Sequence, residues 1–201
     1  MARSKFANNE EALNAIFNES IPLFAKQGFS GASIRHVATA VGVSIATIYH
    51  HFPDKKALYL ATIEASFKDK ALALEDALQP TGAKEQQLRC FIASFTEIMA
   101  NDENFRLLLQ RELIDGDAER LSTLAADVFV NQFENVLKLA ERISPKSDPH
   151  MAAISMISLV FYHLEAAPIR AFLPGGKPEH NDPTVIADHV CSLLINGVFR
   201  G

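Results

Sequence analysis

The feature that most constrains the fold is a glycine inside a short run of apolar residues, in the stretch IRHVATAVGVSIATIYHHFPDKKAL at residues 34–58. Before the glycine, Val37 and Val41 recur at the four-residue spacing of one helix face. Gly42 follows at once, and glycine adopts the positive φ of a sharp turn at little cost. The stretch therefore predicts two short helices joined by a tight turn at Gly42.

The spacing around this turn matches the helix-turn-helix motif. Ala38 is small enough to let a second helix cross closely, Gly42 comes four residues later, and Ile48 faces the core six residues after that. Ser44 is placed to cap the second helix, and Asp54 is placed to cap the next one. Two helices joined by a glycine turn also occur in proteins that do not bind DNA, so the spacing alone leaves both interpretations open.

Almost all of the remaining chain reads as helix, because apolar residues recur at spacings of three and four and β-branched alternation is scarce. The first helix is expected to begin at an Asn9 cap and to stop at Gly28. Pro22 lies inside it and removes one helical hydrogen bond, so we expect a kink there. The expected fold class is all-α, with about nine helices and no convincing strand. These helices cover residues 9–27, 33–41, 44–51, 55–78, 84–100, 103–114, 117–143, 149–172 and 183–199.

The distribution of charge removes an objection to DNA binding. The whole chain has a formal net charge of −5, which argues against a protein that coats nucleic acid indiscriminately. Residues 1–60 nevertheless hold six basic and four acidic residues, so the acidic excess lies in the rest of the chain. A surplus of this size predicts few phosphate contacts in each copy and two copies on the DNA.

The two cysteines, Cys90 and Cys191, sit in apolar helical patterns without a second cysteine or histidine at metal-ligand spacing. We interpret both as free thiols in a reducing compartment. Neighbouring positions on a helix diverge by about 100°, so His50 and His51 do not form a metal pair, and neither a metal nor a cofactor is expected. The first residues lack the apolar segment of a signal peptide, and no run of 18 uncharged apolar residues is present. A soluble cytoplasmic protein is expected.

Several further elements accompany the turn between about residue 16 and residue 60. They are Leu23 and Phe24; Gly28 and Phe29; Ser33, Ile34 and Arg35; Val37 and Ala38; Val41 to Ser44; Thr47, Ile48 and Tyr49; His51 and Phe52; and Lys55 to Leu58. In this combination the stretch resembles the tetracycline-repressor (TetR) family of transcriptional regulators. The resemblance implies a three-helix helix-turn-helix DNA-binding domain at residues 1–55 and a helical ligand-binding and dimerisation domain at residues 56–201.

The resemblance also assigns contacts to the DNA backbone. It implies that Ser33 caps the first short helix and bonds a phosphate, and that Arg35 presents its planar fork to guanine or to a phosphate. Tyr49 and His50 would donate to phosphate oxygens, and Lys55 would meet another phosphate beside a helix amino terminus. For Tyr49 the alternative is a partly buried aromatic residue.

The exposed start of the second short helix would read the bases. It consists of Ser44, Ile45, Ala46 and Thr47, of which Thr47 would reach a phosphate or a base, while Ile45 and Ala46 would touch thymine methyl groups. Ile45 stands where the family often has a polar or basic residue, so apolar contact and DNA shape are expected to share the specificity. The segment before the first helix has only Arg3 and Lys5 as basic residues, which argues against a strong grip on the minor groove.

The remaining two thirds are compatible with a helical domain that binds a small apolar or aromatic molecule. The segment is rich in large apolar side chains, most of which are core residues in any interpretation. An ordinary buried ion pair explains Arg111 as readily as a ligand contact does. The residues that we expect to line a cavity are Phe95, Met99, Arg111, Phe129, Phe133, Tyr162 and His163.

The last two expected helices, 149–172 and 183–199, look like the surface of a homodimer. Ile186, Val190 and Leu193 form one apolar stripe, and Met151 with Ile154 begins another. Two such helices from each subunit would form a four-helix bundle and present two recognition helices to a pseudo-palindromic operator.

The resulting hypothesis is a ligand-responsive, DNA-binding transcriptional regulator and not an enzyme. It would be a repressor that leaves its operator when a small molecule binds and favours another arrangement of the core. One alternative is a DNA-binding or protein-interaction dimer without a ligand. Another is an all-helical enzyme that uses His163 with Glu165, although these positions lie on different helix faces and no nucleophile, glycine-rich loop or metal cluster accompanies them.

Overall fold

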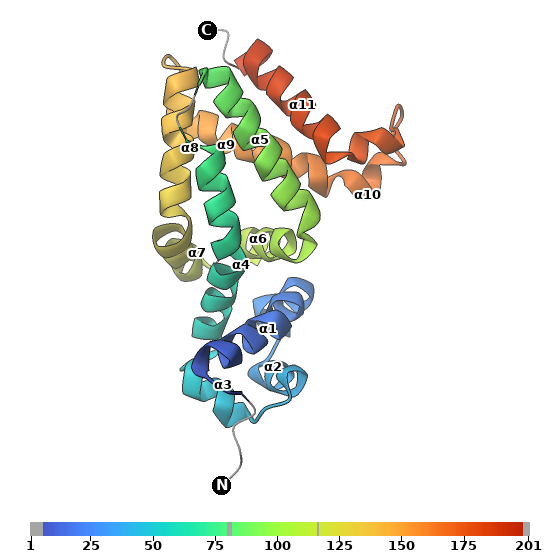
Figure 1. Ribbon diagram of the computed structural model, residues 1–201. Coiled ribbons are helices and arrows are strands. Elements are labelled where there is room, and N and C mark those ends of the chain that lie inside the picture. Colours follow the sequence, from blue (N-terminus) through green and yellow to red (C-terminus); the bar gives the residue numbers. More distant parts are fainter. Residues whose placement is uncertain (1–5, 80–81, 116, 199–201) are drawn as a thin grey trace. The chain divides into compact units, whose positions relative to one another are not determined.

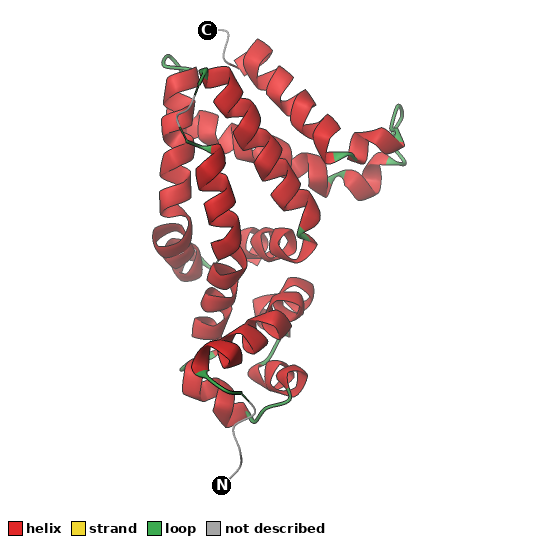
Figure 2. Cartoon of the chain, in the orientation of Figure 1, coloured by secondary structure: helices red, strands yellow, loops and turns green. Residues whose placement is uncertain are grey.

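The computed structural model describes residues 6–79, 82–115 and 117–198. These residues form helices joined by loops, without a strand, as Figure 2 shows, so the all-α prediction is confirmed. The helices are α1 Asn9–Gly31, α2 Ile34–Val41, α3 Ile45–His51, α4 Lys55–Ala77, α5 Lys84–Asn101, α6 Glu103–Asp115, α7 Ala118–Leu124, α8 Val130–Ile143, α9 Pro149–Glu165, α10 Ala167–Arg170 and α11 Pro183–Leu193 (Figure 1).

The chain divides into two compact units. Unit 1 comprises residues 1–69 and 103–128, and unit 2 comprises residues 70–102 and 129–201. Helix α4 therefore begins in unit 1 and ends in unit 2, whereas α6 and α7 group with the first three helices. The functional boundary predicted between residues 55 and 56 follows the sequence motif and not this grouping, and it stays a prediction.

Unit 1 is built around the aromatic residues of α1 and α4. Phe24 and Tyr59 are fully buried and meet edge to face, with ring centroids 4.9 Å apart. Val37 of α2 and Ile48 of α3 are also fully buried, as the apolar spacing predicts. Phe105 of α6 stacks on Phe67 of α4 at 5.8 Å and closes this core.

The local signals of α1 are displaced from two of the predicted positions. The amino-terminal cap is Asn8 and not Asn9, because the Asn8 side chain accepts the backbone N–H of Glu11 at 2.8 Å. The non-helical residue inside α1 is Gly28, with φ 69° and ψ 178°, so the kink expected at Pro22 lies there instead. Pro22 fits the helical backbone, and the predicted stop at Gly28 becomes an interruption followed by one more turn.

Unit 2 packs α5, α8, α9 and α11 around a core of aliphatic and aromatic side chains. Phe91 and Phe95 of α5 stack on each other with ring centroids 5.8 Å apart. Met156 and Val160 of α9 and Val190 of α11 are fully buried.

The long predicted helices in this part of the chain are divided in the structure. A π-helical turn, Ala125–Phe129, separates α7 from α8 within the predicted helix 117–143. The predicted helix 149–172 ends as α9 at Glu165 and is followed by the short α10, because Pro168 cannot supply a helical N–H donor. The predicted helix 183–199 becomes α11 and a π-helical turn, Leu194–Val198, and residue 199 lies outside the described residues. Within the described ranges, no helix combines the length and the hydrophobicity that a membrane crossing requires.

Candidate nucleic-acid interface

The turn between α2 and α3 has the geometry that the sequence predicts. Gly42 adopts the left-handed conformation, with φ 73° and ψ 41°. Its N–H donates to the carbonyl of Thr39 at 3.1 Å, and the N–H of Val43 donates to that of Ala38 at 2.9 Å. These two bonds are the Schellman arrangement, which ends a helix at a residue with positive φ. Gly42 therefore fixes the direction in which α3 leaves α2.

Short side chains cap the amino termini of both helices. Ser33 accepts the N–H of His36 at 3.2 Å, and Ser44 accepts the N–H of Thr47 at 3.1 Å. The hydroxyl groups of Ser44 and Thr47 also bond each other at 2.8 Å. The predicted caps are thus confirmed, and the side-chain oxygens of α3's first turn already have partners within the turn.

Helix α3 turns its buried side toward the core at Ile48 and presents the opposite side to solvent. Ser44, Ala46 and His50 are exposed, and Thr47 is half-buried. Tyr49 is 51% exposed and Ile45 is 36% exposed, both high values for large apolar side chains. The exposed side of α3 thus combines apolar groups with one imidazole.

Helix α2 adds the neighbouring basic group. Arg35 is exposed, and Ser33 is half-buried at the start of the helix. His36 and Thr39 are exposed as well and were not among the predicted contacts, although the apolar period through Val37 places them opposite the core. The hydroxyl of Thr39 donates to the carbonyl of Arg35 at 2.8 Å and is therefore used within the helix.

Lys55 lies at the start of α4 and is directed toward the last turn of α1. Its ammonium donates to the carbonyl of Ser30 at 3.4 Å and lies 4.6 Å from the ring centroid of Phe29. Burial, and secondarily the charge of Arg120, lower the pKa of Lys55. A lysine ammonium has three donors, so the predicted phosphate contact is compatible with these partners and stays a prediction.

His51 and Phe52 complete the end of α3 as structural residues. The Phe52 ring is buried and lies 5.9 Å from that of Phe17 on α1. His51 is half-buried between His50 and Phe52, and its pKa is lowered by burial and then by the charge of His50.

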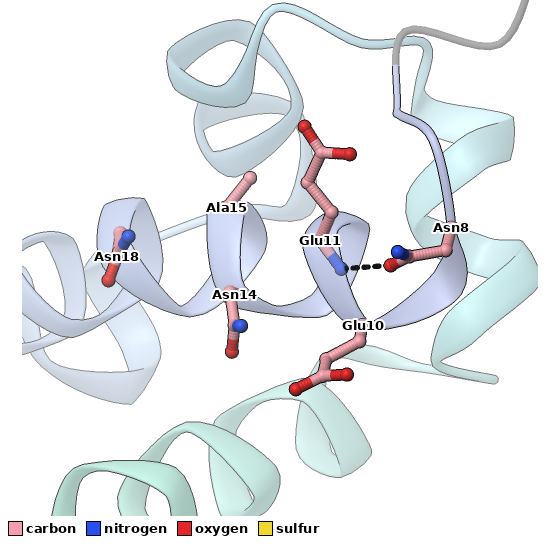
Figure 3. A pocket seen from close by; sticks show the side chains of 6 residues that line it. All are labelled: Asn8, Glu10, Glu11, Asn14, Ala15 and Asn18. Atoms are coloured by element: carbon pink, nitrogen blue, oxygen red, sulfur yellow. Dashed lines mark hydrogen bonds between the residues drawn. The ribbon is translucent and has the colours of Figure 1, made fainter.

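Figure 3 shows a surface hollow along the first turns of α1, which differs in charge from the face just described. Glu10 and Glu11 line it together with the amides of Asn8, Asn14 and Asn18. Two carboxylates disfavour a phosphate group, so this hollow is not a continuation of a phosphate-binding surface.

The predicted ligand-binding residues are divided between the two units. Arg111 belongs to unit 1, where it binds the carbonyls of Ala25 and Lys26, and the other six belong to unit 2. Tyr162 is 75% exposed, so it does not line an interior cavity. None of the seven residues lines the hollow on α1 or a second hollow of unit 2, which extends from Lys70 to Asp102.

Within unit 2 the placement of the remaining predicted ligand residues varies. Phe95 and Met99 are buried on α5, and Phe133 meets His150 edge to face at 5.3 Å. His163 packs against His189 of α11 at 5.3 Å between ring centroids. Phe129 ends the π-helical turn before α8 and is half-buried. Apolar character is thus shared by core residues of several helices without marking a site.

The predicted apolar stripe on α11 faces the wrong way for a subunit contact. Ile186 and Val190 are buried in unit 2, because α11 packs on α5 and α9, and only Leu193 of that stripe is exposed, at 43%. On α9, Met151 is 64% exposed and Ile154 is 41% exposed. The outward faces are therefore the one that carries Met151 and Ile154 on α9 and the one that carries Leu193 on α11.

The amino-terminal segment matches a known family. Residues 16–62 match the model of the bacterial regulatory proteins of the tetR family. The chain is 25% identical over 166 residues to the HTH-type transcriptional activator FasR of Mycolicibacterium smegmatis, with 81% of this chain and 73% of that protein covered.

Solved structures of the same fold extend the similarity beyond the matched segment. A structure of the regulator FadR from Bacillus subtilis in complex with stearoyl-CoA has a TM-score of 0.76 at 15% identity and covers 92% of this chain and 98% of that one. A structure of AibR with isovaleryl coenzyme A and operator DNA has a TM-score of 0.74 at 18% identity and covers 92% of this chain and 98% of that one. Residues 16–62 therefore form a helix-turn-helix segment of the kind found in the bacterial regulatory proteins of the tetR family, and the solved structures show that the whole chain shares their fold.

Proposed function

We propose that this regulator binds double-stranded operator DNA with the exposed side of α3, assisted by α2. One observation carries the proposal: the left-handed turn at Gly42 projects Ile45, Ala46, Tyr49 and His50 outward while Ile48 anchors the helix. A short helix held by its buried side and exposed on the other suits the major groove. No catalytic activity is proposed.

The apolar groups on α3 suggest how the bases are read. Ile45 and Ala46 offer no hydrogen-bond donor, and the hydroxyls of Ser44 and Thr47 bond each other. Thymine methyl groups are the base features that suit such a surface. Arg35, Tyr49 and His50 supply donors for phosphates or base edges around it.

For the effector we propose an acyl thioester of coenzyme A. The support comes from the structures of FadR with stearoyl-CoA and AibR with isovaleryl coenzyme A, which share the fold of this chain. An acyl chain requires apolar side chains, and the interior of unit 2 offers Phe91, Phe95 and Met156.

We further propose a homodimer that uses the exposed faces of α9 and α11, because one copy offers a single α3 and the regulator needs two for a pseudo-palindrome. Repression is the proposed output, since a protein bound across an operator blocks transcription. The relative FasR, which is named an activator, supports activation as the second candidate.

The test begins with selection of a duplex from a randomised library by the full chain, followed by fluorescence anisotropy. Arg35→Ala and Tyr49→Phe should weaken binding to the selected duplex while the melting temperature stays nearly unchanged, because both side chains are exposed. Undiminished binding by both variants would show that the proposed contact face is wrong.

Stearoyl-CoA and isovaleryl-CoA, with coenzyme A alone as the control, test the effector. Either thioester should raise the melting temperature and lower affinity for the duplex, because a ligand that favours one of two states shifts the balance between them. An identical response to coenzyme A alone would assign the effect to the nucleotide part and remove the acyl chain from the proposal.

A further inference from the structure

Helix α1 is interrupted at Gly28, and a residue of α6 stabilises this interruption. In an uninterrupted helix the carbonyls of Ala25 and Lys26 accept the N–H groups of Phe29 and Ser30. The ψ of 178° at Gly28 turns the following peptide away from that direction. These two carbonyls, at the negative end of the helix dipole, therefore need other donors.

Arg111 of α6 supplies them. Its Nε donates to the carbonyl of Ala25 at 2.6 Å, and its Nη2 donates to that of Lys26 at 2.5 Å. A planar guanidinium can donate to two adjacent carbonyls at once, and its positive charge suits a helix carboxyl end. Helix α6 thus provides the carboxyl-terminal cap of α1 from 85 or more residues further along the chain.

A second arginine holds the residue directly after the interruption. The guanidinium of Arg120 lies 4.2 Å from the ring centroid of Phe29. Arg120 is buried and is itself fixed by Glu112 of α6, with Nε to Oε1 at 2.9 Å. Tyr59 joins this cluster, with its ring 5.2 Å from that of Phe29 and 5.7 Å from the Arg120 guanidinium.

The segment held in this way leads directly into α2. Only a few residues separate Phe29 from Ser33, which caps α2 and precedes Arg35. The direction of α2 then determines that of α3 through the turn at Gly42. All of these residues belong to unit 1.

We propose that Arg111 is a positioning residue for DNA binding, through which α6 sets the direction of α2 and α3. The proposal deepens the proposed function, because it names how the DNA-contacting face is controlled and rests on that face binding DNA. Arg111 itself has no contact with DNA in this proposal. Its effect passes through the backbone at residues 25–29.

The experiment compares Arg111→Gln with Arg111→Lys and with Arg142→Gln in the full chain. Arg142 is the matched control, because it also joins two helices through its guanidinium, donating to Gln87 at 2.5 Å within unit 2. The measurements are affinity for the selected duplex and hydrogen exchange of the backbone amides, both taken well below the melting temperature of each variant.

Arg111→Gln should lower the affinity for the duplex about tenfold, which lies in the usual range of coupling between sites. The amides of residues 29–36 should exchange faster, while those of α5 keep the exchange rates of the parent chain. Arg111→Lys should give an intermediate loss, since an ammonium keeps the charge but not the planar fork. Arg142→Gln should leave both readings unchanged.

Two outcomes overturn the inference. One is parent-like affinity and exchange at residues 29–36 in both Arg111 variants. The other is an equal loss of affinity in Arg142→Gln, which would mark a general response to instability. Failure of the parent chain to select or bind any duplex would instead refute the proposed function, so the two failures are distinguishable.

Discussion

The exposed faces of α3 and α9 both carry large apolar side chains, yet their surroundings differ. On α3, Ile45 and Tyr49 stand on a short helix that follows a glycine turn and begins at a serine cap. On α9, Met151, Ile154 and Tyr162 follow one face of a helix of 17 residues. Exposure of apolar groups alone therefore does not identify their partner. The polar and backbone features around them distinguish a surface proposed for DNA from one proposed for a second subunit.

A charge placed on each face gives the largest expected effect. Ile154→Asp should convert the proposed dimer to a monomer, because a carboxylate would be buried without a partner, and operator affinity should fall about 100-fold when two-site binding is lost. Ile45→Asp should abolish operator binding through repulsion of phosphates and leave the dimer intact. Sedimentation measures the oligomeric state, and fluorescence anisotropy measures the affinity for the operator.

The contrast fails if the two variants behave alike. Loss of the dimer in Ile45→Asp, or retention of it in Ile154→Asp, would show that the faces are assigned to the wrong partners. Both residues are partly exposed in a single chain, so melting temperatures close to that of the parent serve as the control for folding.

Replacing either of two glycines by alanine should lower the free energy of unfolding, and only one of the two replacements should also affect DNA binding. Gly42 in unit 1 and Gly175 in unit 2 have φ values of 73° and 79°, so alanine at either position should cost about 1–2 kcal/mol. Thermal unfolding should show a decrease in the melting temperature of about 2–4 °C for each kcal/mol. Only Gly42→Ala should also weaken operator binding, because only that turn directs α3. An equal loss of affinity in both variants would contradict the role of the turn.

The sequence predicts the region around α3 better than the region around α9 and α11, and the reason is physical. The turn at Gly42 and the caps Ser33 and Ser44 are local features, so their residue types and spacing determine the structure within a few positions. The neighbouring Asn8 and Asn9 offer the same side chain, so the exact cap of α1 is not distinguishable by composition.

Packing between helices that are distant in sequence explains the remaining differences between the sequence-based expectations and the structure. Apolar residues occur on more than one side of α11, and the sequence alone does not say that Ile186 and Val190 meet α5 and α9. From the sequence, Arg111 is a candidate ligand contact or equally a member of a buried ion pair, because it is a polar residue in an apolar segment. Its partners in the structure are two carbonyls of α1, and no local sequence pattern predicts a contact between residues so far apart in the chain.

Removal of single methyl groups from the DNA tests whether the exposed side of α3 contacts thymine methyl groups. Deoxyuridine in place of a thymidine that contacts Ile45 or Ala46 should cost about 0.8 kcal/mol, or about fourfold in affinity, because one buried methyl group is lost. Anisotropy with each thymidine of the selected duplex replaced in turn measures this effect. Ile45→Ser should abolish the difference between the two bases at that position. If no thymidine replacement changes affinity, base reading by apolar contact is wrong.

The last prediction concerns how the free energy of unfolding depends on pH through His163 in unit 2, and its effect is small. Burial is the main cause that lowers the pKa of His163 below 6.5, followed by the charges of His189 on α11 and Arg170 on α10. The folded state therefore binds fewer protons at this site than the unfolded state, so the contribution is fully present above pH 6.5 and is lost as pH falls toward the lowered pKa. Unfolding by urea at several pH values should show that His163→Gln flattens this part of the stability profile. A profile as steep in His163→Gln as in the parent chain would mean that other groups take up these protons and that His163 is not the cause of this part of the profile.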